Sequence, residues 1–352
     1  MSDAMKREES IDVLRGVAVL QMIFWQIFDF LGRVDIYSES PYYIHAFHMP
    51  INGIGVCLFA FVSGISLYVS VSRRLGRSER KTSIVVHALR RYGGYIILSL
   101  FFTTFCFGFR TFFTWNEAIQ GIGLSALVTL TFILFVPSNK ALIFVTCFLV
   151  FSQQIIRNVI DLSAVSQAFP FYPVAFGSLS VVTISLLLNV SYRGFFSFSN
   201  LLPFALSGVI LCKEVIRSSD HKVSSKLVTI GSVLIVASLA MHHLGQNISY
   251  YGRSPSYMIF YIGISCVLFA SVKFFSERKP RNSVFRLLSV LGRGALLAYL
   301  IHFLFIFKPA QTLGFEKTFP VPIAMIATVA LIGVIYYIIV KSLKFSQMRR
   351  TK

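Results

Sequence analysis

Long apolar runs recur along the whole chain, each about the length that an α-helix needs to cross the roughly 30 Å hydrocarbon core of a membrane. The runs are continuous rather than alternating, which excludes a β-barrel, the other structure able to span a bilayer. The sequence therefore predicts an all-α, polytopic bundle of transmembrane helices. Ten runs give clear spans, near residues 11–32, 50–72, 92–109, 118–136, 140–156, 198–216, 227–244, 256–275, 287–307 and 321–343.

An eleventh apolar run, 172–190, is ambiguous, and the distribution of positive charge decides its treatment. Loops rich in Lys and Arg stay on the cytoplasmic side of a membrane. With ten spans and a cytoplasmic N-terminus, every basic segment faces the cytoplasm, whereas a full crossing by 172–190 separates them. We therefore expect ten crossings, with 172–190 re-entrant or interfacial on the outer side, and eleven crossings as the alternative. The basic segments are 73–91, 213–226, 278–286 and the C-terminal tail.

The composition agrees with a membrane protein. The chain is 55% hydrophobic and 13% charged, against about 25% charged residues in soluble domains. A net charge of +19 in a soluble protein would suggest nucleic acid, but these charges lie in short loops, so no nucleic-acid partner is expected. We expect one transmembrane domain over 1–352 in the plasma membrane, with cytoplasmic tails at 1–10 and 344–352. Because Arg15 interrupts the first apolar run and no small-residue cleavage site follows, no cleavable signal peptide is expected.

The first span carries polar residues at membrane depth, where each is a functional candidate. Arg15 lies about one turn inside the cytoplasmic boundary. Its long side chain can extend to the lipid headgroups, or it can bind an anion inside the bundle, paired with Asp12 or a ligand phosphate. Gln26 and Asp29 lie near the outer end of the same span and, three residues apart, share one face.

Histidines are the candidates for proton transfer near neutral pH. His45 and His48 are one helical turn apart in the outer segment after the first span, and Asn52 follows them. His302 lies near mid-membrane or slightly outward, where an imidazole needs a partner inside the bundle. A solvated loop histidine is the simpler interpretation of either outer residue.

Further polar residues lie where outer loops meet the spans. Glu117 and Gln120 are at the start of the fourth span, and Arg253 is in the outer turn 242–257. The five cysteines fall within or at the edge of apolar runs with neither disulfide nor metal spacing, so buried free thiols and no metal site are expected. Common hydrolase and nucleotide-binding motifs are absent from the sequence.

Five stretches in order resemble the heparan-α-glucosaminide N-acetyltransferase catalytic-domain family, which belongs to the transmembrane acyltransferase group. Together they cover most of the chain, and their order and spacing are more specific than any one of them. They are Ile11–Ala18 with Met22, Leu58–Leu67, Glu117–Leu124, Leu202–Phe204 with Gly208, and Leu291–Arg293 through Tyr299 to His302.

The resemblance implies transfer of an acyl group from acyl-CoA (acetyl-CoA) to an amine or hydroxyl of a sugar or glycan on the other side of the membrane. Membrane lipids, acyl-CoA and this acceptor are the expected partners, and a homodimer is left open. In the family the base is a histidine in the loop that here holds His45 and His48. The candidate catalytic residues are His45, His48, His302 and Asp29, those for CoA phosphates are Arg15, Arg74, Arg90 and Arg91, and those for the acceptor are Gln26, Asn52, Glu117, Gln120 and Arg253.

The sequence departs from the family pattern at two imidazole positions. Related acyltransferases often have His or Asn eleven residues after the first-span arginine, where this chain has Gln26. The motif around Gln120 likewise has glutamine in place of histidine, and Phe204 stands where a Trp is expected. The alternatives are therefore a non-catalytic, divergent member of the family, a transporter of a small polar solute, and a structural membrane protein.

Overall fold

The structure, a computed structural model, is helical over almost the whole of the part it describes: residues 9–32, 42–107, 118–159, 198–217, 223–244, 254–278 and 283–350. Within those ranges the β-structure is one isolated parallel bridge between Gly32 and Phe319. The predicted all-α class is confirmed. The segment 172–190, predicted to be re-entrant or interfacial, lies outside the described residues.

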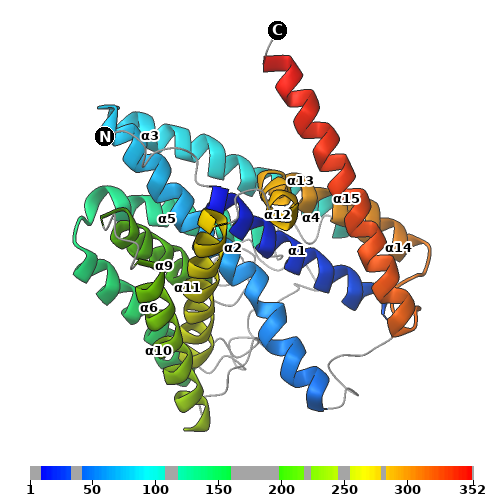
Figure 1. The fold of residues 1–352 in the computed structure, drawn as a ribbon, viewed down its shortest axis with the longest axis horizontal. Helices are drawn as coiled ribbons and strands as arrows, with labels where there is room; N and C mark the ends of the chain where they lie inside the picture. The colour runs from blue at the N-terminus through cyan, green and yellow to red at the C-terminus, as the bar shows by residue number, and fades with distance from the viewer. Residues whose placement is uncertain are drawn as a thin grey trace, which may run out of the picture. The chain divides into compact units, whose positions relative to one another are not determined.

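Helices cover all ten predicted spans, although α2 begins at Tyr42, eight residues before the predicted start of its span. Figure 1 shows their arrangement. Two π-helical turns, η2 and η5, interrupt them. The elements are α1 (Glu9–Leu31), α2 (Tyr42–Gly76), α3 (Lys81–Ala88), η2 (Leu89–Gly93), α4 (Gly94–Phe107), α5 (Ala118–Phe135), α6 (Asn139–Val159), α9 (Phe198–Arg217), α10 (Val223–His243), α11 (Pro255–Arg278), α12 (Ser283–Arg293), α13 (Ala295–His302), η5 (Phe303–Phe307), α14 (Lys308–Thr312) and α15 (Val321–Arg350).

Seven helical stretches in the described ranges are long and apolar enough to cross a membrane. They confirm a polytopic helical membrane protein. An eighth apolar stretch, Asn139–Ser152 in α6, is shorter, and α4 and α9 lie where two further spans are predicted. The seven are Glu9–Phe28, Ile54–Gly76, Ala118–Phe135, Val223–His243, Pro255–Ser276, Ala295–Thr312 and Val321–Phe345.

The chain forms two compact units, which we describe separately. Unit 1 contains Ala60–Cys266, and unit 2 contains Arg7–Phe59 together with Val267–Lys352. Helices α2 and α11 each contribute one part to each unit.

In unit 2, α1 packs against α12, α13 and α15. The crossing of α1 and α12 is close because each helix has a glycine there. A Cβ on Gly16 would overlap the carbonyl oxygen of Leu288, and a Cβ on Gly292 would overlap the carbonyl oxygen of Asp12. Small residues allow this close backbone approach in membrane helix pairs.

The end of α1 is fixed by backbone hydrogen bonds to the segment before α15. The amide of Lys317 donates to the carbonyl of Phe30 at 2.9 Å, and the amide of Phe319 donates to that of Leu31 at 3.0 Å. The last carbonyls of a helix have no partner within the helix, and these bonds satisfy two of them.

In unit 1, contacts bring together three segments that the charge pattern assigns to one side of the membrane. Lys81 donates to the carbonyl of Leu134 at 3.4 Å, and Lys213 donates to that of Pro137 at 3.4 Å. Asn139 also bonds to Glu214. The start of α3, the α5–α6 turn and the end of α9 therefore meet at one end of the unit.

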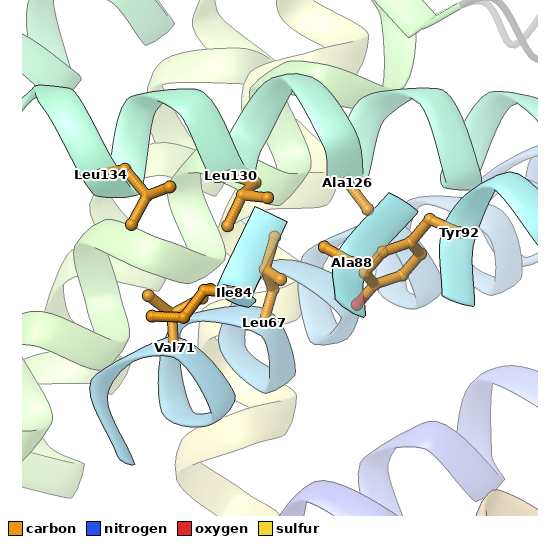
Figure 2. Close-up of a cluster of buried hydrophobic side chains, with 8 residues drawn as sticks. All are labelled: Leu67, Val71, Ile84, Ala88, Tyr92, Ala126, Leu130 and Leu134. Atoms are coloured by element: carbon orange, nitrogen blue, oxygen red, sulfur yellow. The ribbon is translucent and has the colours of Figure 1, made fainter. Parts of the chain in front are cut away.

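The predicted cytoplasmic loop 73–91 is largely helical, which corrects its boundary. Helix starts again at Lys81 and continues through η2 into α4, so Arg90 and Arg91 lie on a helix and not in a loop. Figure 2 shows the reason: residues of α2, α3 and η2 pack on α5 in one apolar cluster. The cluster contains Leu67, Val71, Ile84, Ala88, Tyr92, Ala126, Leu130 and Leu134.

The predicted span 287–307 is divided in the structure. The amphipathic helix α12 ends at Arg293, and α13 begins after Gly294. A Cβ on Gly294 would come into close contact with Ile339 of α15. The apolar stretch able to cross a membrane therefore begins at Ala295 and not at 287.

Candidate functional site

The first polar feature of unit 2 is an ion pair on α1. Nη1 of Arg15 lies 3.0 Å from Oδ1 of Asp12, one turn earlier on the same helix. The Asp12 side chain is nearly buried and that of Arg15 partly exposed. Since Gly16 is the next residue, the guanidinium lies beside the close crossing with α12. Two of the stretches that carry the family resemblance, around Arg15 and around Gly292, thus pack against each other.

The second feature joins α1 to α13 across most of the sequence. The side-chain oxygen of Gln26 lies 2.7 Å from Nε2 of His302, and the other ring nitrogen, Nδ1, lies 3.3 Å from the carbonyl oxygen of Ala298. The imidazole is fully buried. The partner that the sequence analysis requires for His302 is therefore Gln26.

The hydrogen-bonding groups around His302 restrict its tautomer. A carbonyl oxygen only accepts, so Nδ1 donates to Ala298 if that bond forms. In a neutral ring Nε2 then accepts, and it needs the amide N–H₂ of Gln26 opposite it. Exchanging the oxygen and nitrogen of this amide supplies that donor, and the assignment of the two atoms follows from the hydrogen-bond network. With the amide oxygen facing Nε2 at 2.7 Å, Nε2–H donates to it instead. In either arrangement Gln26 engages Nε2, the ring nitrogen that a general base would use.

Aromatic side chains enclose the imidazole. The ring centroids of Tyr299 and Phe303 lie 5.2 Å and 4.4 Å from that of His302. Tyr299 is one turn before His302 on α13 and is also buried. The Gln26–His302 pair therefore lies in a tightly packed apolar setting.

A double-mutant cycle is expected to show that Gln26 and His302 act as a unit. Gln26→Leu and His302→Phe should each cost about 1 kcal/mol of stability, the typical scale for a hydrogen bond between membrane helices. Because both changes remove the same bond, the double variant should lose less than the sum of the two. Thermal unfolding of the four proteins in detergent measures this, with His243→Phe, an exposed residue at the end of α10, as control. Strictly additive losses would contradict the pairing.

Arg15 and Gln26 are eleven residues apart on α1. At 1.5 Å per residue this is about 16 Å, roughly half the thickness of the hydrocarbon core. A close contact between α1 and α2 lies between these two residues. A Cβ on Gly55 of α2 would meet the side-chain oxygen of Gln21, and would lie 3.3 Å from the carbonyl oxygen of Ala18. The part of α2 around Gly55 therefore approaches α1 between its two polar features.

His45, His48 and Asn52 lie on α2, before Gly55. The steps from Gly55 back to Asn52, His48 and His45 are three, four and three residues, so these positions share one face of the helix. Their side chains, and that of Asp29 on α1, lie outside what the structure describes, as do Glu117 and Arg253 altogether. The remaining acceptor candidate, Gln120, is buried in the first turn of α5, in unit 1.

Two of the four arginines predicted to hold phosphates, Arg74 and Arg91, line one small pocket in unit 1. Arg90 does not line it, although Arg90, Arg91 and His87 are all exposed. The pocket also contains His87, which the sequence analysis missed. Its spacing of four residues from Arg91 was the available signal, since residues at i and i+4 of a helix are neighbours.

Among the residues that the structure describes, no three His, Cys, Asp or Glu side chains form a group able to hold a metal ion. The polar features are therefore a guanidinium–carboxylate pair, an amide–imidazole pair and a basic pocket. These are groups that bind anions, donate hydrogen bonds and transfer protons.

Comparison with known families decides the class. The family model described as "Acyltransferase domain" matches residues 8–340, almost the whole chain. The chain belongs to this acyltransferase family. It is thus a helical integral membrane protein of the acyltransferase-domain family, and the match includes both α1 and the α12–α13 region. A search of curated proteins found no match.

Proposed function

We propose that this acyltransferase-family member moves an acetyl or other acyl group from acyl-CoA to an amine or hydroxyl of a sugar or glycan on the outer face of the membrane. The donor would bind at the cytoplasmic side, and the plasma membrane is the proposed location. The five stretches that resemble the heparan-α-glucosaminide N-acetyltransferase family support this acceptor class.

The observation that carries the proposal is the arrangement of α1. One helix of the matched region holds a guanidinium near its start and an amide bonded to a buried imidazole near its end. A guanidinium suits phosphate, and the amide–imidazole pair lies about 16 Å farther along the helix. A membrane enzyme with its donor on one side and its acceptor on the other needs polar groups at both depths.

The proposed reaction is direct acyl transfer. The acceptor nitrogen or oxygen attacks the thioester carbonyl, a base takes the acceptor's proton, and CoA leaves as its thiol. With Nε2 of His302 bonded to Gln26, we assign the base to His45 or His48. Asn52, on the same face of α2, is the proposed donor to the oxyanion.

A direct assay tests the function. Purified protein in lipid nanodiscs is incubated with radiolabelled acetyl-CoA and a panel of amino sugars and glycans. We expect release of CoA that depends on the acceptor, and label on the acceptor. Absence of both acetyl-CoA binding and turnover would overturn the proposal.

The glutamine at position 26, where related acyltransferases often have His or Asn, favours a second candidate function, that of a non-catalytic member of the family. An amide cannot act as a base, and in this chain it is hydrogen-bonded to Nε2 of the neighbouring imidazole. The same assay separates the two, because a non-catalytic member would bind acetyl-CoA without releasing CoA.

A further inference from the structure

The pocket in unit 1 combines positive charge with an apolar floor. The basic groups that line it are Arg74 of α2, His87 of α3 and Arg91 of η2, and Ser70 and Tyr92 line it as well. The floor is formed by Leu67, Val71, Ile84 and Ala88, which belong to the cluster drawn in Figure 2. A ligand that fits both parts has an anionic group attached to an apolar one.

The pocket lies beside the apolar cluster that α2, α3 and η2 form on α5. Tyr92, beside Arg91, packs in the same cluster as Ala126, and a Cβ on Gly123 would lie 3.2 Å from the Tyr92 carbonyl oxygen. Residues 123 and 126 are in the middle part of the candidate span Ala118–Phe135. Arg74 is two residues before the end of the candidate span Ile54–Gly76, so the pocket extends from the end of that span toward the residues of η2, and charged groups at such a place are candidates for a functional site.

The local backbone suits a ligand site as well. Leu89–Gly93 forms a π-helical turn, an irregularity that is frequent at functional sites. A Cβ on Gly93 or Gly94 would meet nothing within 4 Å, so these glycines are not required for packing and leave space beside the arginines.

The charged groups keep donors for a ligand. Arg74 gives Nη1 to Glu79 at 3.1 Å, and a guanidinium has five N–H donors, so others remain. Arg91 lies against the Tyr92 ring, with 5.4 Å between its guanidinium carbon and the ring centroid, and it shares a side-chain hydrogen bond with Tyr95, which leaves further N–H groups. His87 is four residues before Arg91 and so lies on the same side of the helix.

We propose that this pocket binds a phosphoryl group through Arg74, His87 and Arg91. Two ligands carry this group on a partly apolar molecule: the CoA of an acyl donor and an anionic phospholipid. If the ligand is CoA, the inference rests on the proposed function; if it is a lipid, it is independent of it.

The test uses Arg91→Gln and His87→Gln in the full-length protein, with Arg90→Gln as the matched control. Arg90 is the adjacent arginine on the same π-turn, and the control removes the same charge outside the pocket. Equilibrium dialysis measures binding of radiolabelled acetyl-CoA, with pantetheine as the phosphate-free probe. Native mass spectrometry of protein from nanodiscs measures retained phosphatidylglycerol, with phosphatidylcholine as the neutral lipid.

If the ligand is CoA, Arg91→Gln should weaken acetyl-CoA binding by about tenfold to a hundredfold, the effect of losing a charge-assisted hydrogen bond. His87→Gln should weaken it less, Arg90→Gln by under about twofold, and pantetheine should not compete. If the ligand is a lipid, the same ranking should appear in retained phosphatidylglycerol, with acetyl-CoA binding unchanged.

Equal effects of Arg90→Gln and Arg91→Gln, or no effect of Arg91→Gln on the binding of either ligand, would contradict phosphoryl binding in this pocket. Gel filtration and circular dichroism verify that each variant is folded. Turnover is measured separately. A protein that binds acetyl-CoA through Arg91 but releases no CoA would contradict the proposed function and would still support phosphoryl binding in the pocket.

Discussion

Replacing Gly292 with alanine is expected to prevent normal folding of unit 2. The added methyl carbon would overlap the carbonyl oxygen of Asp12 and lie 2.9 Å from the amide nitrogen of Gly16. Both are backbone atoms, so α1 and α12 must separate to make room. Overpacking of this kind costs about 1–3 kcal/mol or more, a large fraction of the stability of a typical domain. The expected result is a strong fall in the yield of monodisperse protein and in its unfolding temperature.

Gly333→Ala is the matched control. Gly333 lies within α15, and a Cβ there would meet nothing within 4 Å. Alanine should be neutral or slightly stabilising, because it favours helix over glycine by about 1 kcal/mol. A thiol-reactive dye can follow unfolding through the buried cysteines Cys57, Cys212 and Cys266. A Gly292→Ala protein as stable as Gly333→Ala would show that the helices do not cross as described.

Changing both His45 and His48 to alanine is expected to lower acyl transfer by about 10²–10⁴-fold, the contribution of a general base. The single variants then assign the role. Replacing the histidine that acts as the base should cause nearly all of the loss of turnover, and replacing the other histidine much less. Turnover of radiolabelled acetyl-CoA measures this. Binding of acetyl-CoA should stay within about twofold of wild type, because in the proposed reaction the base contacts the acceptor and not the CoA phosphates.

The exposed pair His242 and His243 at the end of α10 offers the control. The corresponding double alanine variant removes two adjacent imidazoles and should leave turnover unchanged. Full activity of the His45→Ala/His48→Ala protein would rule out a base in this segment. Loss of turnover together with acetyl-CoA binding would indicate a structural role.

Continuous apolar runs were enough to predict the fold class, because a membrane helix must be apolar along its length. Hydropathy did not locate every helix. Residues 81–91 are rich in charge and were assigned to a loop, yet Ile84 and Ala88 are buried against α5. Contact of these two residues with α5 is sufficient to position the helix, and an average over a window that includes the neighbouring arginines does not detect it.

The division of 287–307 was missed for a related reason. Gly294 stands in an apolar run and does not interrupt the hydropathy. The helix boundary there depends on α15, since Ile339 occupies the space that a side chain at 294 would need. Such a constraint comes from a residue distant in sequence.

The candidate site was predictable in its parts but not in its pairing. Gln26, His302 and Arg15 were identified as polar residues at membrane depth. The substitution at Gln26 was interpreted as the loss of a base, whereas the structure gives it a hydrogen bond to an imidazole 276 residues away. One sequence gives no information on which distant polar residues meet.

The crossing of α1 and α12 also has a genetic consequence. Gly16 and Gly292 each face the main chain of the opposite helix, with no side chain between them. A harmful substitution in an ordinary core is often rescued by a smaller residue at a neighbouring position, but a peptide carbonyl cannot be made smaller. A saturation library selected for folded protein should therefore retain glycine at both positions, and a search for second-site suppressors should recover none within this contact.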